Sequence, residues 1–162
     1  MQECLQALDK GKIVQGLAPQ VPSSSTPDYV SMKGHDRLTI LISCANAGSA
    51  SGAAVALKQA QDVSATGEKV LGFEKVYANE DTGASDTLVE TTVTSDTFDT
   101  DDADSTDLFY VIEVKAEDLD AENNFDCVRA DIGDPTNQTV DIVYFLHAPR
   151  YAPTLDESVI TD

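Results

Sequence analysis

The chain has 162 residues, a length typical of a single domain, and 41% of them are hydrophobic. Its 29 Asp and Glu outnumber its 10 Lys and Arg, and the formal net charge of −19 disfavours binding to nucleic acid or to an anionic membrane and favours a basic partner. No apolar stretch reaches the roughly 18 residues of a transmembrane helix and the N-terminus does not resemble a signal peptide, so we expect a protein that is made in the cytoplasm and does not bind membranes.

Residues 1–28 have the composition of an N-terminal arm. The segment from Pro19 to Pro27 is rich in proline and serine, which is typical of a linker, and Gly11 and Gly16 precede it. The apolar side chains of the arm need a surface to cover, either on the domain itself or on a neighbouring subunit. We predict these residues as partner contacts: Leu5, Leu8, Ile13, Val14 and Leu17.

The chain has three cysteines, Cys4, Cys44 and Cys127. An odd number with no close pair argues against a disulfide framework and against a CxxC metal site. Cys44 ends an alternating apolar run, which predicts a buried thiol. Cys4 lies on the arm, where it can form an interchain disulfide outside the reducing cytosol or remain an exposed thiol.

From Tyr29 onward the apolar residues recur with a period of two, the pattern of a β-strand with one buried face. In the run from Leu38 to Cys44 the alternate residues share one face, which we expect to be buried. Further strands are predicted at residues 54–60, 70–78, 87–94, 108–115, 125–132 and 139–147.

Together with the run that starts at Tyr29, these segments amount to about eight short strands, with no helix of ten residues or more. The pattern predicts an all-β domain over residues 29–151, built as an antiparallel β-sandwich or barrel. The aromatic residues Tyr110, Tyr144 and Phe145 lie on predicted strands, and most of them are expected in the core. Residues 152–162 are predicted to be a short acidic tail.

Acidic residues are concentrated in the middle of the chain, since residues 76–114 contain no Lys or Arg. The segment from Asp99 to Asp107 is predicted to be an exposed loop, because burying its charges unpaired would be unfavourable. Carboxylates are the hard ligands that calcium prefers, but Ala103 and the missing glycine break the EF-hand spacing. No metal or other cofactor is therefore expected, and the weak metal candidates are Asp99, Asp101, Asp102 and Asp104.

No catalytic set is recognisable, and we expect a protein that is not an enzyme. The segment Gly48–Gly52 resembles a nucleophile elbow, but Ala50 stands where that motif requires serine. The two histidines, His35 and His147, belong to no nucleophile–base pattern. The chain has no Trp, which argues against a carbohydrate-cleaving site with aromatic platforms.

Several stretches together resemble small structural proteins that tailed phages encode near the major capsid gene: residues 29–40, 57–60, 67–69, 108–120, 125–129 and 144–151. The likeness covers roughly residues 28–152. It implies a capsid decoration or cement protein, made in the host bacterial cytoplasm and located in the virion, that binds the major capsid protein in many copies. Because icosahedral shells favour symmetric clusters, a homo-oligomer such as a dimer or trimer is expected.

Two alternatives to capsid decoration remain open. A neck, tail or head-fibre component differs from a capsid protein in copy number, which the sequence does not reveal. A β-sandwich module that binds carbohydrate or a host surface is a different class of protein, and the missing Trp argues against sugar stacking.

Overall fold

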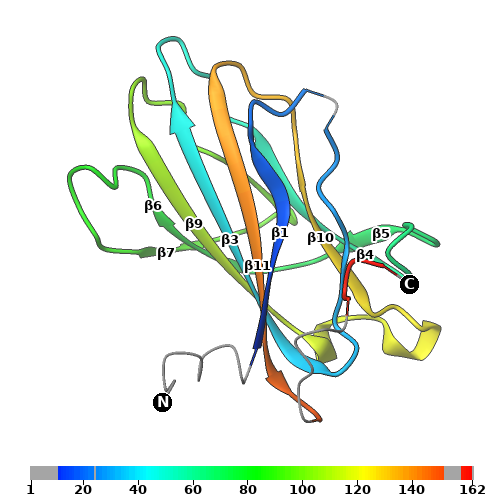
Figure 1. Cartoon of the computed structure of the whole chain (residues 1–162). Helices are drawn as coiled ribbons and strands as arrows, with labels where there is room; N and C mark the ends of the chain where they lie inside the picture. Colours follow the sequence, from blue (N-terminus) through cyan, green and yellow to red (C-terminus); the bar gives the residue numbers. More distant parts are fainter. Residues whose placement is uncertain (1–10, 24, 152–157, 162) are drawn as a thin grey trace, which may run out of the picture.

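The computed structural model describes residues 11–23, 25–151 and 158–161 (Figure 1). Their strands form a sandwich of two antiparallel sheets, which confirms the all-β prediction and selects the sandwich over the barrel. The described residues contain eleven strands rather than about eight: β1 (Gly11–Gln20), β2 (Val30–Ser31), β3 (His35–Asn46), β4 (Ala54–Ala60), β5 (Lys69–Leu71), β6 (Lys75–Asn79), β7 (Val89–Thr92), β8 (Thr97–Asp99), β9 (Asp107–Lys115), β10 (Cys127–Ile132) and β11 (Gln138–Pro149).

The two sheets are unequal. The larger has six strands in the order β1-β11-β3-β9-β6-β7, and the smaller has five, in the order β2-β10-β4-β5 with β8 also paired to β4. The helical content of the described residues is two 3-10 turns, η2 (Ala116–Asp118) and η3 (Ala121–Asn123). No helix in this part of the chain is long and apolar enough to cross a membrane.

The segment predicted as one strand over residues 70–78 is instead two strands in different sheets. β5 pairs with β4 in the smaller sheet, whereas β6 pairs with β7 and β9 in the larger one. The chain crosses between the layers at residues 72–74, so Leu71 and Val76 enter the core from opposite sides. The buried positions change phase at this crossing, since Leu71 and Val76 are five residues apart, so residues 70–78 do not form one strand with a single buried face.

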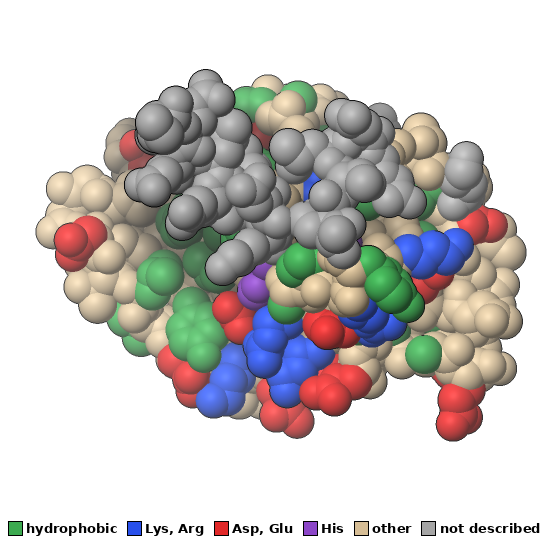
Figure 2. Space-filling view, turned by 60° about the horizontal axis from the view of Figure 1, so that its bottom comes forward, with side chains coloured by type: hydrophobic (Ala, Val, Ile, Leu, Met, Phe, Trp, Pro, Cys, Tyr) green, Lys and Arg blue, Asp and Glu red, His purple; other side chains and the backbone are tan. Residues whose placement is uncertain are grey.

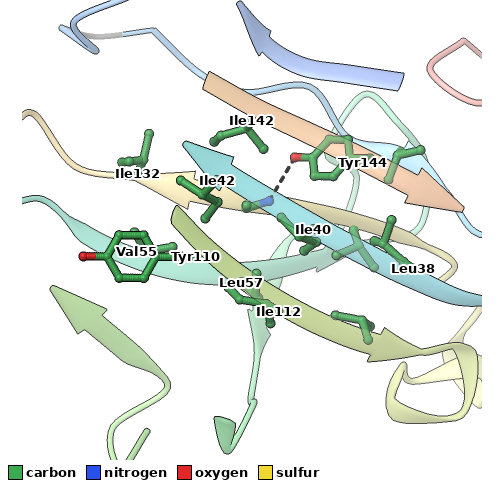
Figure 3. Packing of buried hydrophobic residues seen from close by; sticks show 14 of the residues in the cluster. Leu38, Ile40, Ile42, Val55, Leu57, Tyr110, Ile112, Ile132, Ile142 and Tyr144 are labelled. Atoms are coloured by element: carbon green, nitrogen blue, oxygen red, sulfur yellow. Dashed lines mark hydrogen bonds between the residues drawn. The ribbon is translucent and has the colours of Figure 1, made fainter. Parts of the chain in front are cut away.

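The core lies between the sheets and follows the period of two (Figure 3). On β3 the residues Leu38, Ile40, Ile42 and Cys44 are all buried, as the alternation predicted. Full burial of one such aliphatic side chain stabilises the fold by roughly 1.5–3 kcal/mol. Further buried residues come from β9, β11, β4 and β10: Tyr110, Ile112, Val140, Ile142, Leu146, Val55, Leu57, Val128 and Ala130.

Tyr144 ties the two sheets together. It belongs to β11 in the larger sheet and is fully buried. Its hydroxyl accepts a hydrogen bond from the backbone N–H of Ala130 on β10 at 3.1 Å, drawn as a dashed line in Figure 3. The same hydroxyl donates to the carbonyl of Asp28 at 3.0 Å, so its polar atom is satisfied inside the core.

The prediction of an arm over residues 1–28 is wrong for Gly11–Gln20, which form β1 at the edge of the larger sheet, paired with β11. Gly16 is needed there because a Cβ at this position would lie 2.3 Å from a ring carbon of Tyr144. This glycine, which lies within the predicted arm, permits close packing of a strand over an aromatic ring. The folded domain therefore begins before residue 29.

Part of the predicted acidic tail also belongs to the domain. The carbonyl of Val159 accepts a hydrogen bond from the backbone N–H of Ser31 at 2.7 Å, and the Val159 side chain is buried in the core. Residues 158–161 thus lie against β2. The rest of the predicted tail, residues 152–157 and 162, lies outside the described residues.

Candidate partner-binding surfaces

One end of the sandwich is uniformly acidic. Four loops meet there, at residues 47–53, 80–88, 100–106 and 133–137, and backbone hydrogen bonds link neighbouring loops. None of these loops contains Lys or Arg. The acidic end is formed by the carboxylates of the loops and of the adjoining strand ends: Glu80, Asp81, Asp86, Asp99, Asp101, Asp102, Asp104, Asp107 and Asp134.

A buried amide network anchors the acidic end. The Gln138 side chain is fully buried, and its Nε2 donates to Asn46 Oδ1 at 2.7 Å, while its Oε1 accepts from Thr100 Oγ1 at 2.8 Å. Asn46 in turn donates to the carbonyls of Asp101 and Ala103. The loop is therefore residues 100–106, held by these hydrogen bonds and with Thr100 buried, between Asp99 at the end of β8 and Asp107 at the start of β9; it is not the wholly exposed loop over 99–107 that its charge predicted.

The four weak metal candidates do not converge on a common point. Asp101 accepts a hydrogen bond from the backbone N–H of Ala103, and Asp104 accepts one from Ala50. Asp99 and Asp102 are exposed. Within the described residues, no group of three or more His, Cys, Asp or Glu side chains is placed to hold a metal ion. Two of these carboxylates instead stabilise loop backbone.

The outer face of the larger sheet carries an apolar band. Tyr77, Val111, Leu41 and Val143 are register neighbours on four adjacent strands, β6, β9, β3 and β11, and all four are half-buried. Their chain neighbours point into the core, so these side chains point outward. Two further residues, themselves paired in register, complete the band: Ile13 and Phe145. Ile13 is 57% exposed.

Such a band is unusual, because the outer face of an antiparallel sandwich commonly carries polar side chains. Contiguous exposed apolar surface marks a binding site more often than it occurs by chance. The apolar band therefore stands out as the candidate partner-binding surface of the described protein.

Cationic side chains border this face at the end opposite the acidic loops. Arg37 and Lys115 are register partners on β3 and β9, and both are exposed. Arg150 follows β11 and pairs with Asp36. An open hollow of about 520 Å³ lies among these residues. Figure 2 looks onto this end and shows Lys and Arg side chains gathered there with acidic side chains between them.

The outer face of the smaller sheet is different, because its charges satisfy one another. Glu68 accepts from Lys58 Nζ at 2.9 Å and from the Tyr29 hydroxyl at 2.7 Å, and it forms an ion pair with Arg129 at 3.1 Å. Arg129 also pairs with Asp131 and lies over the Tyr29 ring. The hydrogen bond from Lys58, followed by that from Tyr29, lowers the pKa of Glu68. This ion-paired face offers little to a partner.

The predicted partner contacts separate into three groups. Val14 and Leu17 are buried in the domain's own core, so they are not available to a partner while β1 stays in the sheet. Ile13 faces outward in the apolar band. Leu5 and Leu8, and Cys4 with its predicted interchain disulfide, lie outside the described residues. Cys44 is buried, as expected.

Sequence reasoning missed most of the apolar band. The signal was present in the sequence, since Leu38–Ile42 and Ile142–Leu146 carry apolar residues on both faces of the strand and not only at alternate positions. A strand that is apolar on both sides is typical of a sheet covered on both faces. Phe145, one of three aromatic residues of which most were expected in the core, belongs to this second set and lies on the outer face, where its ring stacks on that of His147 with 5.2 Å between centroids.

Comparisons with known proteins identify no family. No protein-family model matches the chain, and no curated protein sequence matches it. Among solved structures the chain is similar to the SPBc2 prophage-derived protein YomS, with a TM-score of 0.44 and 9% sequence identity over 85% of this chain and 93% of that chain. A TM-score below 0.5 does not establish a shared fold, and this likeness carries no argument about function.

Proposed function

We propose that this protein is a structural component of a tailed-phage particle, and that it decorates and stabilises the capsid by binding the major capsid protein. The resemblance of the sequence to small phage structural proteins suggests the particle. The observation that supports a docking role is the apolar band on the outer face of the larger sheet.

The band provides the kind of surface that a protein partner recognises. It combines two aromatic side chains with aliphatic ones on a rigid, hydrogen-bonded sheet, and the exposed Arg37 and Lys115 lie at its rim. An apolar centre with a charged rim is the usual anatomy of a protein interface. A rigid sheet also loses little conformational entropy on binding.

The protein acts in many copies as a dimer or trimer in the virion, is made in the host bacterial cytoplasm, and catalyses no reaction. It binds neither nucleic acid nor membrane, in keeping with its net charge of −19. A shell with many sites multiplies weak single contacts into stable attachment.

A pair of isosteric substitutions tests the docking surface. Val111→Thr combined with Val143→Thr replaces two methyl groups of the band with hydroxyl groups and keeps the β-branched shape that suits a strand. The matched control is Val70→Thr, on the outer face of the smaller sheet, where Val70 is 53% exposed. Binding is measured by co-sedimentation with heads purified from a phage strain that lacks this gene.

The double variant is expected to bind the heads at least about tenfold more weakly than the wild type, and the control is expected to bind normally. Circular dichroism confirms that each variant is folded. Equal binding by the folded double variant and the wild type would show that the apolar band is not the docking surface. Failure of the wild-type protein to bind these heads would refute the capsid assignment itself.

A further inference from the structure

The outer edge of β7 is an unpaired strand edge with exposed apolar side chains. β7 ends the larger sheet, and within the described residues it pairs with β6 alone. Val89 is 62% exposed although its register partner Ala78 is buried, so the described chain leaves the core-facing side of β7 largely uncovered. Leu88, immediately before β7, is 43% exposed.

The register defines which backbone groups face this free edge. The N–H of Val93 donates to the carbonyl of Glu74 on the β6 side at 2.8 Å. In an antiparallel pair, residues alternate between bonding the partner and facing away from it. Counting back from Val93 along the register, Thr91 and Val89 bond β6, whereas the N–H and C=O groups of Thr92 and Glu90 face outward.

The other sheet edges carry features that block strand addition. The β1 edge contains Pro19 and two register shifts, and the carbonyl of Gly16 accepts a hydrogen bond from Asp28. β2 has two residues and is covered by Val159, while β5 and β8 have three residues each. Proteins commonly protect edges by such shortening, proline, bulges and covering segments. β7 has four residues and contains neither Pro nor Lys.

The charge around β7 indicates what kind of strand would pair with it. The segments that flank β7 in the chain carry Glu80, Asp81, Asp86 and Asp96, and residues 76–114 contain no Lys or Arg. The single charge within β7, Glu90, is already paired with Lys75 of β6 at 2.8 Å. A second copy of this chain would bring the same acidic segments to the edge, and their repulsion disfavours pairing of β7 with itself.

We propose that β7 accepts an extended, lysine- or arginine-bearing segment of another polypeptide, which adds to the larger sheet as a further strand. Backbone hydrogen bonds to Glu90 and Thr92 would hold the segment, apolar residues would cover Leu88 and Val89, and cationic residues would face the flanking carboxylates. This surface is separate from the apolar band, and the inference does not depend on the capsid proposal.

The test uses purified full-length protein and a nine-residue synthetic peptide in which lysines flank alternating valine and threonine. Thr92→Pro removes an outward N–H and leaves the bonds to β6 intact, since proline is tolerated at such edge positions. Thr92→Ala is the matched control because it keeps that N–H. Fluorescence anisotropy measures affinity, and amide hydrogen exchange followed by NMR locates the contact.

The lysine peptide is expected to protect the Glu90 and Thr92 amides from exchange and to bind Thr92→Pro at least about tenfold more weakly than Thr92→Ala. Two further peptides are tested on the wild-type protein: one has glutamate in place of lysine, and the other is the lysine peptide N-methylated at alternate backbone nitrogens. Both should bind at least about tenfold more weakly than the unmodified lysine peptide. Because they need no protein variant, they test the proposal even if Thr92→Pro fails to fold. Equal binding of the lysine and glutamate peptides, or no protection of these amides, would overturn the proposal. Concentration-dependent self-association that Thr92→Pro abolishes would overturn it in favour of a second copy.

Discussion

Gln138 and Asn46 are register partners at adjacent ends of β11 and β3, and their side-chain amides form a hydrogen bond of 2.7 Å. Gln138 is fully buried and Asn46 is 6% exposed. The pair joins the sandwich to the backbone of the acidic loop, because each side chain also donates to the carbonyl of Asp101. The most highly charged segment of the protein is therefore held by an uncharged network beneath it.

We predict that Gln138→Ala lowers the free energy of unfolding by about 2–4 kcal/mol, because the buried Asn46 Oδ1 loses its donor and the Thr100 hydroxyl loses its acceptor. Urea denaturation followed by circular dichroism measures the loss. Thr139→Ala, at the exposed neighbouring position, is the control and should change stability by less than about 0.5 kcal/mol. Similar stabilities for the two variants would show that the network does not hold the loop.

The bond between the sheets gives a second prediction. Tyr144→Phe removes the hydroxyl that accepts from Ala130 and donates to Asp28, and it is expected to reduce stability by about 1–3 kcal/mol because a buried N–H loses its acceptor. Tyr151→Phe changes a side chain that is 79% exposed and should have no measurable effect in the same thermal or urea melt. If Tyr144→Phe melts at the same temperature and urea concentration as the wild type, the hydrogen bond between the Tyr144 hydroxyl and Ala130 contributes nothing to stability.

The ion-paired face predicts a pH dependence. Lys58 and Tyr29 lower the pKa of Glu68 in the folded protein, so ionised Glu68 stabilises the fold. This contribution of Glu68 to stability is fully present above the pKa of an unfolded Glu, about 4.3, and it is lost as the pH falls through the lower pKa of the folded protein. Glu68→Gln should therefore be less stable than the wild type by about 1 kcal/mol near neutral pH, and the difference should shrink in acid.

Glu117→Gln provides the control for this pH series, since the Glu117 side chain is 74% exposed in its pair with Lys115. Urea melts at several pH values should show little difference from the wild type for this variant. If the free energy of unfolding of Glu68→Gln stays below that of the wild type by the same amount down to strongly acidic pH, the packing of Glu68 and not its charge accounts for the lost stability.

Cysteine reactivity gives a fourth prediction. Burial raises the pKa of the Cys44 thiol to about 12, so the reactive thiolate is nearly absent at neutral pH. Iodoacetamide should leave Cys44 unmodified in the folded protein and alkylate it after unfolding in urea, as read by peptide mass spectrometry. Rapid alkylation of Cys44 under native conditions would contradict the buried position on β3.

Period-two alternation was sufficient to predict the fold class and the core face of β3, because a half-buried strand leaves that pattern in the sequence. It failed at β1, which was predicted to be part of an arm and in which Gly16 fits against Tyr144. It failed again at residues 70–78, where the chain crosses between the sheets and the buried positions change phase between Leu71 and Val76. Contacts between residues distant in sequence decide both cases, and local patterns do not contain them.

The candidate binding surface was predictable only in part. Ile13 was identified as an apolar residue in need of a partner, and it does lie on the outer face. The row of Leu41, Val111 and Val143 becomes a surface only once the strand order brings these residues side by side. The free edge of β7 likewise follows from the order of strands in the sheet, which the sequence does not state.

The most direct test of the central proposal is the copy number of this protein in particles of the phage that carries the gene, measured by quantitative mass spectrometry against the major capsid protein. The decoration role predicts a ratio near one or another large simple fraction. A handful of copies per particle would place the protein in the neck or tail, and its absence from the particle would contradict a structural role altogether.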